Sequence, residues 1–326
     1  MATKGERPHI VIQPRDVAVL TALADCRVAT LAQLASLHFA DRREAAKKRL
    51  RGLTIAGYVA RRPLPHLRFA AFVLTQRGLA TADVGADSPS RRSGTLGSPV
   101  RHAIGPLKVR HDLEVGTVRG AIIGDAESRR DLQIVDLCTR PERLAFEARG
   151  RDGRVARVKP DGYVHWHDAG TKDGTGHRRC FIEVDRSTES LGVLVDRAAR
   201  YAEYYRTGGF AVRMGALVAD FKRHPFRVLI VCQTAERRNN LAEWLARSGS
   251  AYLGQVWVTT VNDCERGFFG PVWVTPRDYR DAVRGTPYDL DRAARIGAYR
   301  TDPERQKLVE ERIAKRELAD GPDRAE

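Results

Sequence analysis

The sequence predicts an α/β (α+β) protein in which a small helix-rich unit precedes a larger unit built around a mixed sheet. Two patterns favour this class: three short helical segments followed by two strand-like runs before residue 85, and alternating helix- and strand-like segments after residue 105. Residues 85–105 are rich in Ser, Gly and Pro, a composition typical of linkers. We therefore expect units at residues 1–84 and 106–284, a linker at 85–105 and a charged tail at 285–326.

Three helical patterns open the chain. The first contains Pro14 in its opening turn and has apolar residues at helical spacing. Thr30 is expected to cap the second, LAQLASLHF, and Asp41 to cap the third, which Gly57 would end. The expected apolar stripe of the third helix consists of Ala46, Leu50, Leu53 and Ile55.

A basic hairpin follows these helices. Residues 58–75 read as two strands around a turn with two prolines, and Thr75 is expected to open one more helix. Three helices and then a hairpin is the order of a winged helix-turn-helix, whose third helix enters the DNA major groove. The expected DNA-binding residues are Arg42, Arg43, Lys47, Lys48, Arg51, Arg61, Arg62 and Arg68. The alternative is a small helical domain with a solvated basic face.

The charge distribution supports a polyanion partner. The net charge is +15, and residues 1–105 contain 17 Lys and Arg against 7 Asp and Glu. This excess in the first third favours double-stranded DNA as a partner. A genome that favours Arg codons is the alternative explanation for the charge.

The sequence also excludes several classes of protein. No apolar run approaches the roughly 20 residues of a membrane span, and the first ten residues lack the apolar core of a secretory signal. The five scattered cysteines form no CxxC pair and exclude a disulfide scaffold. We therefore expect a cytoplasmic protein without a membrane partner.

The second unit is expected to alternate helices and strands. A helix over 106–123 precedes strand-like runs at 131–137, 159–166 and 179–185. A helix begins near 187–190 and ends near 206, and two further strands, at 226–232 and 255–261, enclose a helix over 235–247. This order predicts a mixed sheet with helices packed on it.

Three carboxylates at strand ends suggest a metal site. Asp161 follows Pro160 at the head of one strand, and Glu183 and Asp185 share one face of the next because strand side chains alternate. Buried neighbouring carboxylates are costly unless a cation neutralises them, and oxygen ligands suit Mg²⁺ or Mn²⁺. The alternative is a surface turn at Asp161 and salt bridges at Glu183 and Asp185.

Longer motifs add a family resemblance. Pro160-Asp161 followed by Glu183-Val184-Asp185 resembles the PD-(D/E)xK nuclease pattern. The strings KPDGYV, FIEVDRSTES and DRAARYAEYY, with FVLTQRGLA and His111, resemble the replication-relaxation family of plasmids and integrative elements over roughly residues 10–235. That family is similar to relaxases of the MobC type. The resemblance implies a winged helix joined to a restriction-endonuclease-like domain that acts on mobile-element DNA, with Glu114 as a further acid.

One departure bears on catalysis. The nuclease pattern has a Lys two residues after the Glu, where this chain has Asp185. The replacement candidates are Arg197, on the following helix, and Lys159. Because Arg does not accept a proton at neutral pH, metal binding is better supported than cleavage.

The sequence leaves three functions open. The first is a Mg²⁺- or Mn²⁺-dependent DNA nickase, in which metal-bound water attacks a phosphodiester and Arg197 or Lys159 stabilises the charge. The second is a non-catalytic transcriptional or replication regulator with a degenerate nuclease fold. The third is a recruiter of a relaxase or replication protein. A homodimer is a further expected assembly.

Overall fold

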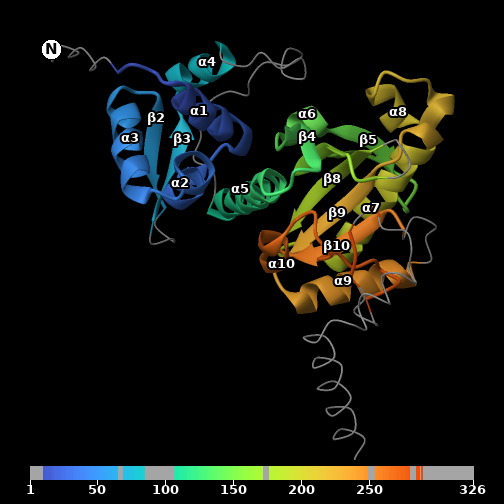
Figure 1. Cartoon of the computed structure of the whole chain (residues 1–326). Coiled ribbons are helices and arrows are strands. Elements are labelled where there is room, and N and C mark those ends of the chain that lie inside the picture. The colour runs from blue at the N-terminus through green and yellow to red at the C-terminus, as the bar shows by residue number, and fades with distance from the viewer. Residues whose placement is uncertain are drawn as a thin grey trace, which may run out of the picture.

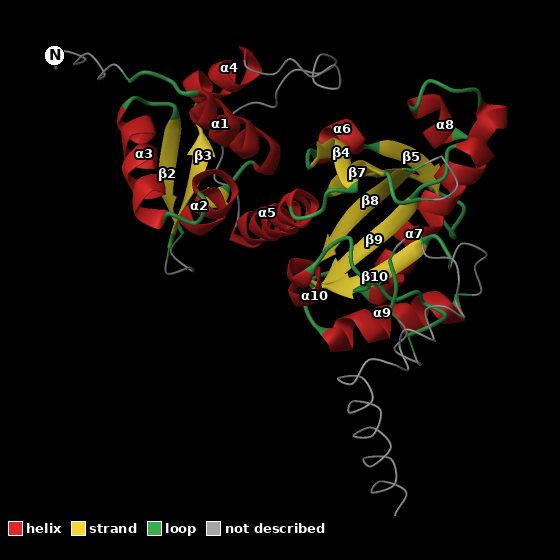
Figure 2. Cartoon of the chain, viewed as in Figure 1, coloured by secondary structure: helices red, strands yellow, loops and turns green. Residues whose placement is uncertain are grey.

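The computed structural model describes residues 10–64, 69–84, 106–171, 176–248, 254–279, 284–286 and 288. They form a mixed α/β structure in two parts (Figures 1 and 2). We call residues 10–84 the N-terminal lobe and the part from residue 106 onward the C-terminal lobe. The expected linker at 85–105, Arg68 and nearly all of the expected tail lie outside the described residues.

The N-terminal lobe packs its helices around a small antiparallel sheet. Strand β3 lies between β1 and β2, and buried leucines of the first three helices share one apolar core with it. The elements are α1 (Pro14–Cys26), β1 (Ala29–Thr30), α2 (Leu31–Phe39), α3 (Arg43–Ile55), β2 (Val59–Pro63), β3 (Ala70–Leu74) and α4 (Gln76–Val84). The order of the four helices and the β2–β3 hairpin matches the sequence prediction, whereas the short strand β1 was not predicted.

Local capping explains where two of these helices begin. The Thr30 hydroxyl accepts a hydrogen bond from Gln33 N at 3.1 Å, and the Gln33 side chain accepts one from Thr30 N at 2.9 Å. The two bonds form the capping box of α2, as expected for Thr30. At the start of α4, the Thr75 hydroxyl accepts from Gly78 N at 3.2 Å.

Two details of α3 differ from the prediction. Asp41 does not cap the helix: the N-cap is Arg42, which makes no side-chain capping bond, and Asp41 has a φ of 58° in the preceding turn. A short polar side chain tolerates this left-handed conformation. Ile55 does not join the apolar core but is 51% exposed, because it lies two positions after the buried Leu53 and so on another side of the helix.

The C-terminal lobe is built on a five-stranded sheet in the order β10-β9-β8-β7-β4. Strands β8, β9 and β10 run parallel, whereas β7 pairs antiparallel with both β8 and β4. The helices are α5 (Pro106–Glu127), α6 (Pro141–Leu144), α7 (Leu191–Arg206), α8 (Gly209–Arg213), η2 (Val218–Arg223), α9 (Ala235–Arg247) and α10 (Val261–Arg266). The strands are β4 (Leu132–Cys138), β5 (Phe146–Arg149), β6 (Val155–Val158), β7 (Gly162–Asp168), β8 (His177–Asp185), β9 (Arg227–Cys232) and β10 (Val256–Thr260).

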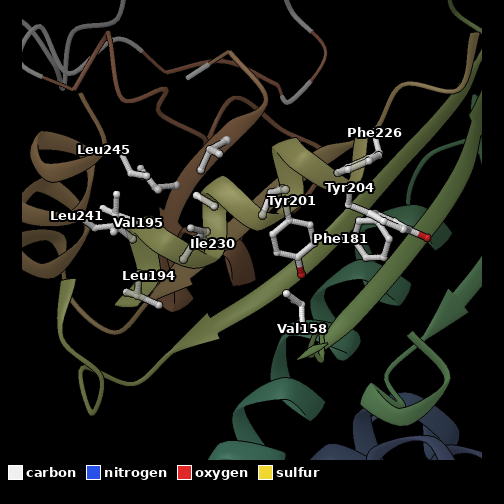
Figure 3. Close-up of a cluster of buried hydrophobic side chains, with 14 of the residues drawn as sticks. Val158, Phe181, Leu194, Val195, Tyr201, Tyr204, Phe226, Ile230, Leu241 and Leu245 are labelled. Atoms are coloured by element: carbon white, nitrogen blue, oxygen red, sulfur yellow. The ribbon is translucent and has the colours of Figure 1, made fainter. Parts of the chain in front are cut away.

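Helices cover both faces of this sheet. Phe181 and Ile230 belong to the cluster that α7 and α9 bury against one face, which Figure 3 shows together with Tyr201 and Leu241. Ile182, the neighbour of Phe181, belongs to a second cluster with α5 and α10 on the opposite face. The alternation along β8 therefore places odd-numbered residues on the α7 side.

Several features of the C-terminal lobe were not predicted, among them the short helices α6, α8, η2 and α10. The hairpin of β5 and β6 has no strong apolar run, and its strands alternate or are largely exposed. Tyr288, within the expected exposed tail, instead packs edge-on against Trp166, and its hydroxyl donates to Arg179 O at 2.6 Å. Among the described residues, no helix is both long enough and apolar enough to span a membrane.

A buried ion cluster joins the two lobes. Asp25, on α1, accepts hydrogen bonds from Arg119 of α5 at 3.0 Å and from Arg140 at 2.6 and 2.9 Å. All three side chains are buried. Nearby, the Gln33 amide donates to Leu113 O on α5 at 2.8 Å. Helix α5 is therefore bound directly to the N-terminal lobe.

We expect Asp25→Asn to destabilise the protein by about 3–5 kcal/mol, because it leaves two buried guanidinium groups without their anion. Urea unfolding of the full chain measures this change. Glu44→Gln is the matched control, since Glu44 is 87% exposed beside Lys47; its effect should stay within about 0.5 kcal/mol. Equal effects of the two variants would contradict a structural role for the cluster.

Candidate functional site

The candidate site lies at the carboxyl end of the parallel strands, where ligands commonly bind in α/β sheets. Strand β8 ends at Asp185, and β9 ends beside it at Cys232. A cleft of about 640 Å³ opens there between α5, β6, β8 and α7. Five of the six predicted catalytic residues line this cleft: Lys159, Asp161, Glu183, Asp185 and Arg197.

Glu183 is held by two groups of α7. It is buried on the α7 face of β8, where Arg197 Nη1 donates to Oε2 at 3.0 Å and the Tyr201 hydroxyl donates to Oε1. Arg197 and Tyr201 are one helical turn apart, so both reach the same carboxylate. Burial raises the pKa of Glu183 to about 7, although Arg197 opposes this shift. Glu183 is thus a buried carboxylate bound by a partly exposed arginine and by a phenol.

Arg197 and Tyr201 keep their protons in this arrangement. Burial lowers the pKa of Arg197, but Glu183 and Glu189 outweigh it and hold the guanidinium above its ordinary value. Burial and the neighbouring Glu183 raise the pKa of Tyr201 well above its usual range. Neither group can therefore act as a proton acceptor at neutral pH, and Tyr201 is a buried packing residue rather than an exposed nucleophile.

Asp161 and Asp185 also have protein partners. Asp161 Oδ1 lies 2.7 Å from His111 Nε2 on α5, and Asp161 Oδ2 accepts from Val184 N at 2.9 Å. Asp185 is bound by Arg237 of α9, with Nε–Oδ2 at 2.6 Å and Nη2–Oδ1 at 3.3 Å. Burial lowers the pKa of His111, but the bond to Asp161 outweighs burial and raises it overall.

The donor set does not form a ready metal site. Each of the three carboxylates predicted as metal ligands is already bound by an arginine, a histidine, a tyrosine or the backbone. In the part of the chain that the structure describes, no three His, Cys, Asp or Glu side chains are grouped so that they could hold a metal ion. The Mg²⁺ or Mn²⁺ site stays a prediction.

Glu114 lies outside this cleft. Its carboxylate accepts from Arg186 at 3.0 Å and from the Gln233 amide at 2.8 Å. It lines a larger groove of about 1210 Å³ between the two lobes. Arg186 lines both the groove and the cleft.

The described residues of the predicted DNA-binding set divide into two groups. Arg43, Lys47 and Arg51, spaced four residues apart, form one stripe that lines the groove, as does Arg61 of β2. Arg42, Lys48 and Arg62 are exposed but do not line it. Half of the predicted DNA-binding set therefore faces the C-terminal lobe.

Sequence reasoning missed Arg237 and Arg186 as partners of the acids. Arg237 lies 52 positions after Asp185 and reaches it only because β9 runs parallel to β8. The Thr234 cap of α9, which accepts from Arg237 N at 3.1 Å, is the local signal that fixes the first turn of that helix. No short motif connects these positions.

We expect Arg197→Ala to destabilise the protein by about 3–5 kcal/mol, because it leaves the buried Glu183 without its cation. Glu183→Gln alone and the double variant Arg197→Ala/Glu183→Gln complete a double-mutant cycle measured by urea unfolding. The double variant should be more stable than Arg197→Ala alone, because it no longer buries an unpaired carboxylate. Additive losses would contradict direct coupling of the pair.

Comparisons with known proteins place the chain in a family. No curated protein and no solved structure matches it. The family model described as replication-relaxation matches residues 20–218, which is more than half of the chain. The protein therefore belongs to the replication-relaxation family.

Proposed function

We propose that this protein binds the DNA of a mobile element during its replication or relaxation, with the N-terminal lobe acting as a winged helix-turn-helix. Membership of the replication-relaxation family supports a role in replication or relaxation. Support for DNA comes from the order of α2, α3 and the β2–β3 hairpin, together with the charge of α3. Helix α3 would be the recognition helix, and β2 would contact phosphates through Arg61 and Arg62.

The stripe of α3 carries this proposal. Arg43, Lys47 and Arg51 lie on the same side of the helix, and their side chains are exposed. Lys47 has a partner in Glu44 at 3.5 Å, but that pair is exposed, so water and salt screen it. When such cations bind phosphates, counterions are released from the DNA. This release contributes more free energy than the weak ion pair within the helix does.

For the C-terminal lobe, the favoured role is non-catalytic: a nuclease-like fold that holds DNA or a partner for a replication regulator or recruiter. The supporting observation is the buried contact between Arg197 and Glu183, because Arg takes the place of the lysine of the nuclease pattern. A guanidinium binds phosphate well but does not relay protons. A relaxase, a replication protein and a second copy of the chain are the candidate partners.

A second candidate is a metal-dependent DNA nickase or nuclease. It is favoured by the convergence of Asp161, Glu183 and Arg197 from three elements in one cleft. This function requires a Mg²⁺ or Mn²⁺ ion to displace arginines from the carboxylates, since the described residues offer no vacant set of ligands.

We expect Arg43→Ala/Lys47→Ala/Arg51→Ala to weaken duplex DNA binding strongly. Each lost phosphate contact should also reduce the slope of log affinity against log salt concentration by about 0.9. Fluorescence anisotropy with a labelled duplex over a series of salt concentrations measures both quantities.

The matched control is Arg42→Ala/Lys48→Ala, which removes exposed cations of the same helix that do not line the groove. The control should change the slope less than the stripe variant does. If the two variants weaken binding equally, helix α3 contributes only general charge, and the assignment of the stripe fails.

We expect no metal-dependent nicking of a supercoiled plasmid that carries the cognate element. Agarose gels of reactions with Mg²⁺, Mn²⁺ or EDTA test this expectation for the wild type and for Glu183→Gln. Nicking that needs the metal and disappears in Glu183→Gln would establish the second candidate function in place of the first.

A further inference from the structure

The groove between the lobes has a basic wall on each side. One wall is the α3 stripe with Arg61, and the other carries Arg110 of α5 and Arg186, which follows β8. Glu114 is the one acidic residue among the described residues that line it, and Arg186 already neutralises this carboxylate. The groove is therefore strongly positive although two separate lobes form it.

Arg186 occupies the junction between the groove and the cleft. Its Nε donates to Glu114 at 3.0 Å, and its Nη1 donates to Leu107 O at 3.1 Å. The side chain is 15% exposed, and it lines both cavities. A chain of phosphates that follows the groove from α3 therefore meets Arg186 before it reaches Asp161 and Glu183.

Cationic side chains continue from the groove into the cleft. Arg157, Lys159 and Arg200 line it together with Arg197, and they balance the acids that line it too, which are Asp161, Glu183, Asp185, Glu189 and Asp196. Lys108 of α5 also lines the cleft, where it pairs with Asp112 at 2.7 Å. An anionic ligand moving from the groove into the cleft thus remains beside cationic side chains.

We propose that the DNA interface is composite: the backbone bound by α3 continues across Arg110 and Arg186 of the C-terminal lobe and enters the cleft at Asp161 and Glu183. This inference rests on the proposed function of α3 and adds phosphate-binding residues that belong to the other lobe. The ligand is DNA, because a path of cations that extends over two lobes matches a chain of phosphates rather than a single small anion.

The attachment of the lobes makes the path continuous. Asp25 binds Arg119 and Arg140 in a buried cluster, and Gln33 binds α5 directly. Gly116 lets α2 approach closely, since an added Cβ there would lie 3.3 Å from Gln33 Nε2. The α3 stripe and Arg110 therefore keep a fixed separation, as two contacts on one DNA backbone require.

The test compares the full-length chain with Arg110→Ala, Arg186→Ala and Glu114→Gln by anisotropy with a labelled duplex at several salt concentrations. Each arginine variant should bind several-fold more weakly and reduce the salt slope by about 0.9 for one lost phosphate contact. Glu114→Gln should bind more tightly, because it removes the groove's acid while keeping a hydrogen-bonding side chain of the same shape. A gain in affinity cannot come from misfolding.

Arg223→Ala is the matched control, since Arg223 is 83% exposed on η2 and lines neither cavity. It should leave the slope unchanged. If Arg110→Ala, Arg186→Ala and Glu114→Gln behave like Arg223→Ala while the α3 stripe variant loses affinity, the composite interface is wrong and the proposed function stands. If the wild-type chain does not bind the duplex, the proposed function fails with it.

Discussion

The arrangement of this molecule depends on the buried contact of Asp25 with Arg119 and Arg140. Burial of charged groups costs free energy because they lose their water. A buried ion pair offsets this desolvation penalty only when hydrogen bonds satisfy its polar atoms. Here Arg140 binds one oxygen of Asp25 through two nitrogens, and Arg119 binds the other oxygen. These hydrogen bonds depend on the direction of donor and acceptor, whereas apolar packing would let the two lobes slide past each other more readily. The cluster therefore sets the angle between α1 and α5, and the groove beside α3 follows from that angle.

The chemistry of the cleft follows from the use of arginine. A lysine beside Glu183 could lose its proton when desolvated, whereas a guanidinium remains charged and binds carboxylates through the N–H donors in its plane. Arg197 joins Glu183 to Glu189, and Arg237 joins Asp185 to the Glu189 carbonyl at 2.6 Å. The acids and the start of α7 are thus connected in one network. This network supplies protein partners for the buried carboxylates at the carboxyl end of the sheet.

Much of the fold was predictable because its signals are local. The Thr30 capping box, the basic helix over residues 43–55 and the alternation along β8 depend on neighbours in the sequence. The same alternation correctly placed Glu183 beside the helix that carries Arg197. The β5–β6 hairpin was not predictable, because its exposed Arg and Glu side chains leave little apolar pattern.

The partners of the site were harder to predict than its acids, for a physical reason. Arg237 contacts Asp185 through parallel pairing of β8 and β9, and Glu114 meets Gln233 across 119 positions. Such contacts depend on sheet order, which residue spacing does not specify. The inward orientation of Arg43 and Lys47 likewise depends on where α5 lies relative to α3, and the contacts of Asp25 and Gln33 decide that position.

The buried acids of the cleft then have a purpose beyond stability. Apolar residues of similar volume can stabilise a core as well as a buried ion pair does, so stability alone does not account for these carboxylates. Glu183 and Asp185 instead hold Arg197 and Arg237 in fixed directions, and the Arg197 side chain lines the cleft with 28% of its surface exposed. An arginine held in this way loses less conformational freedom when a phosphate arrives. Under the proposed DNA-binding function, the acids of the cleft serve to orient Arg197 for a phosphate.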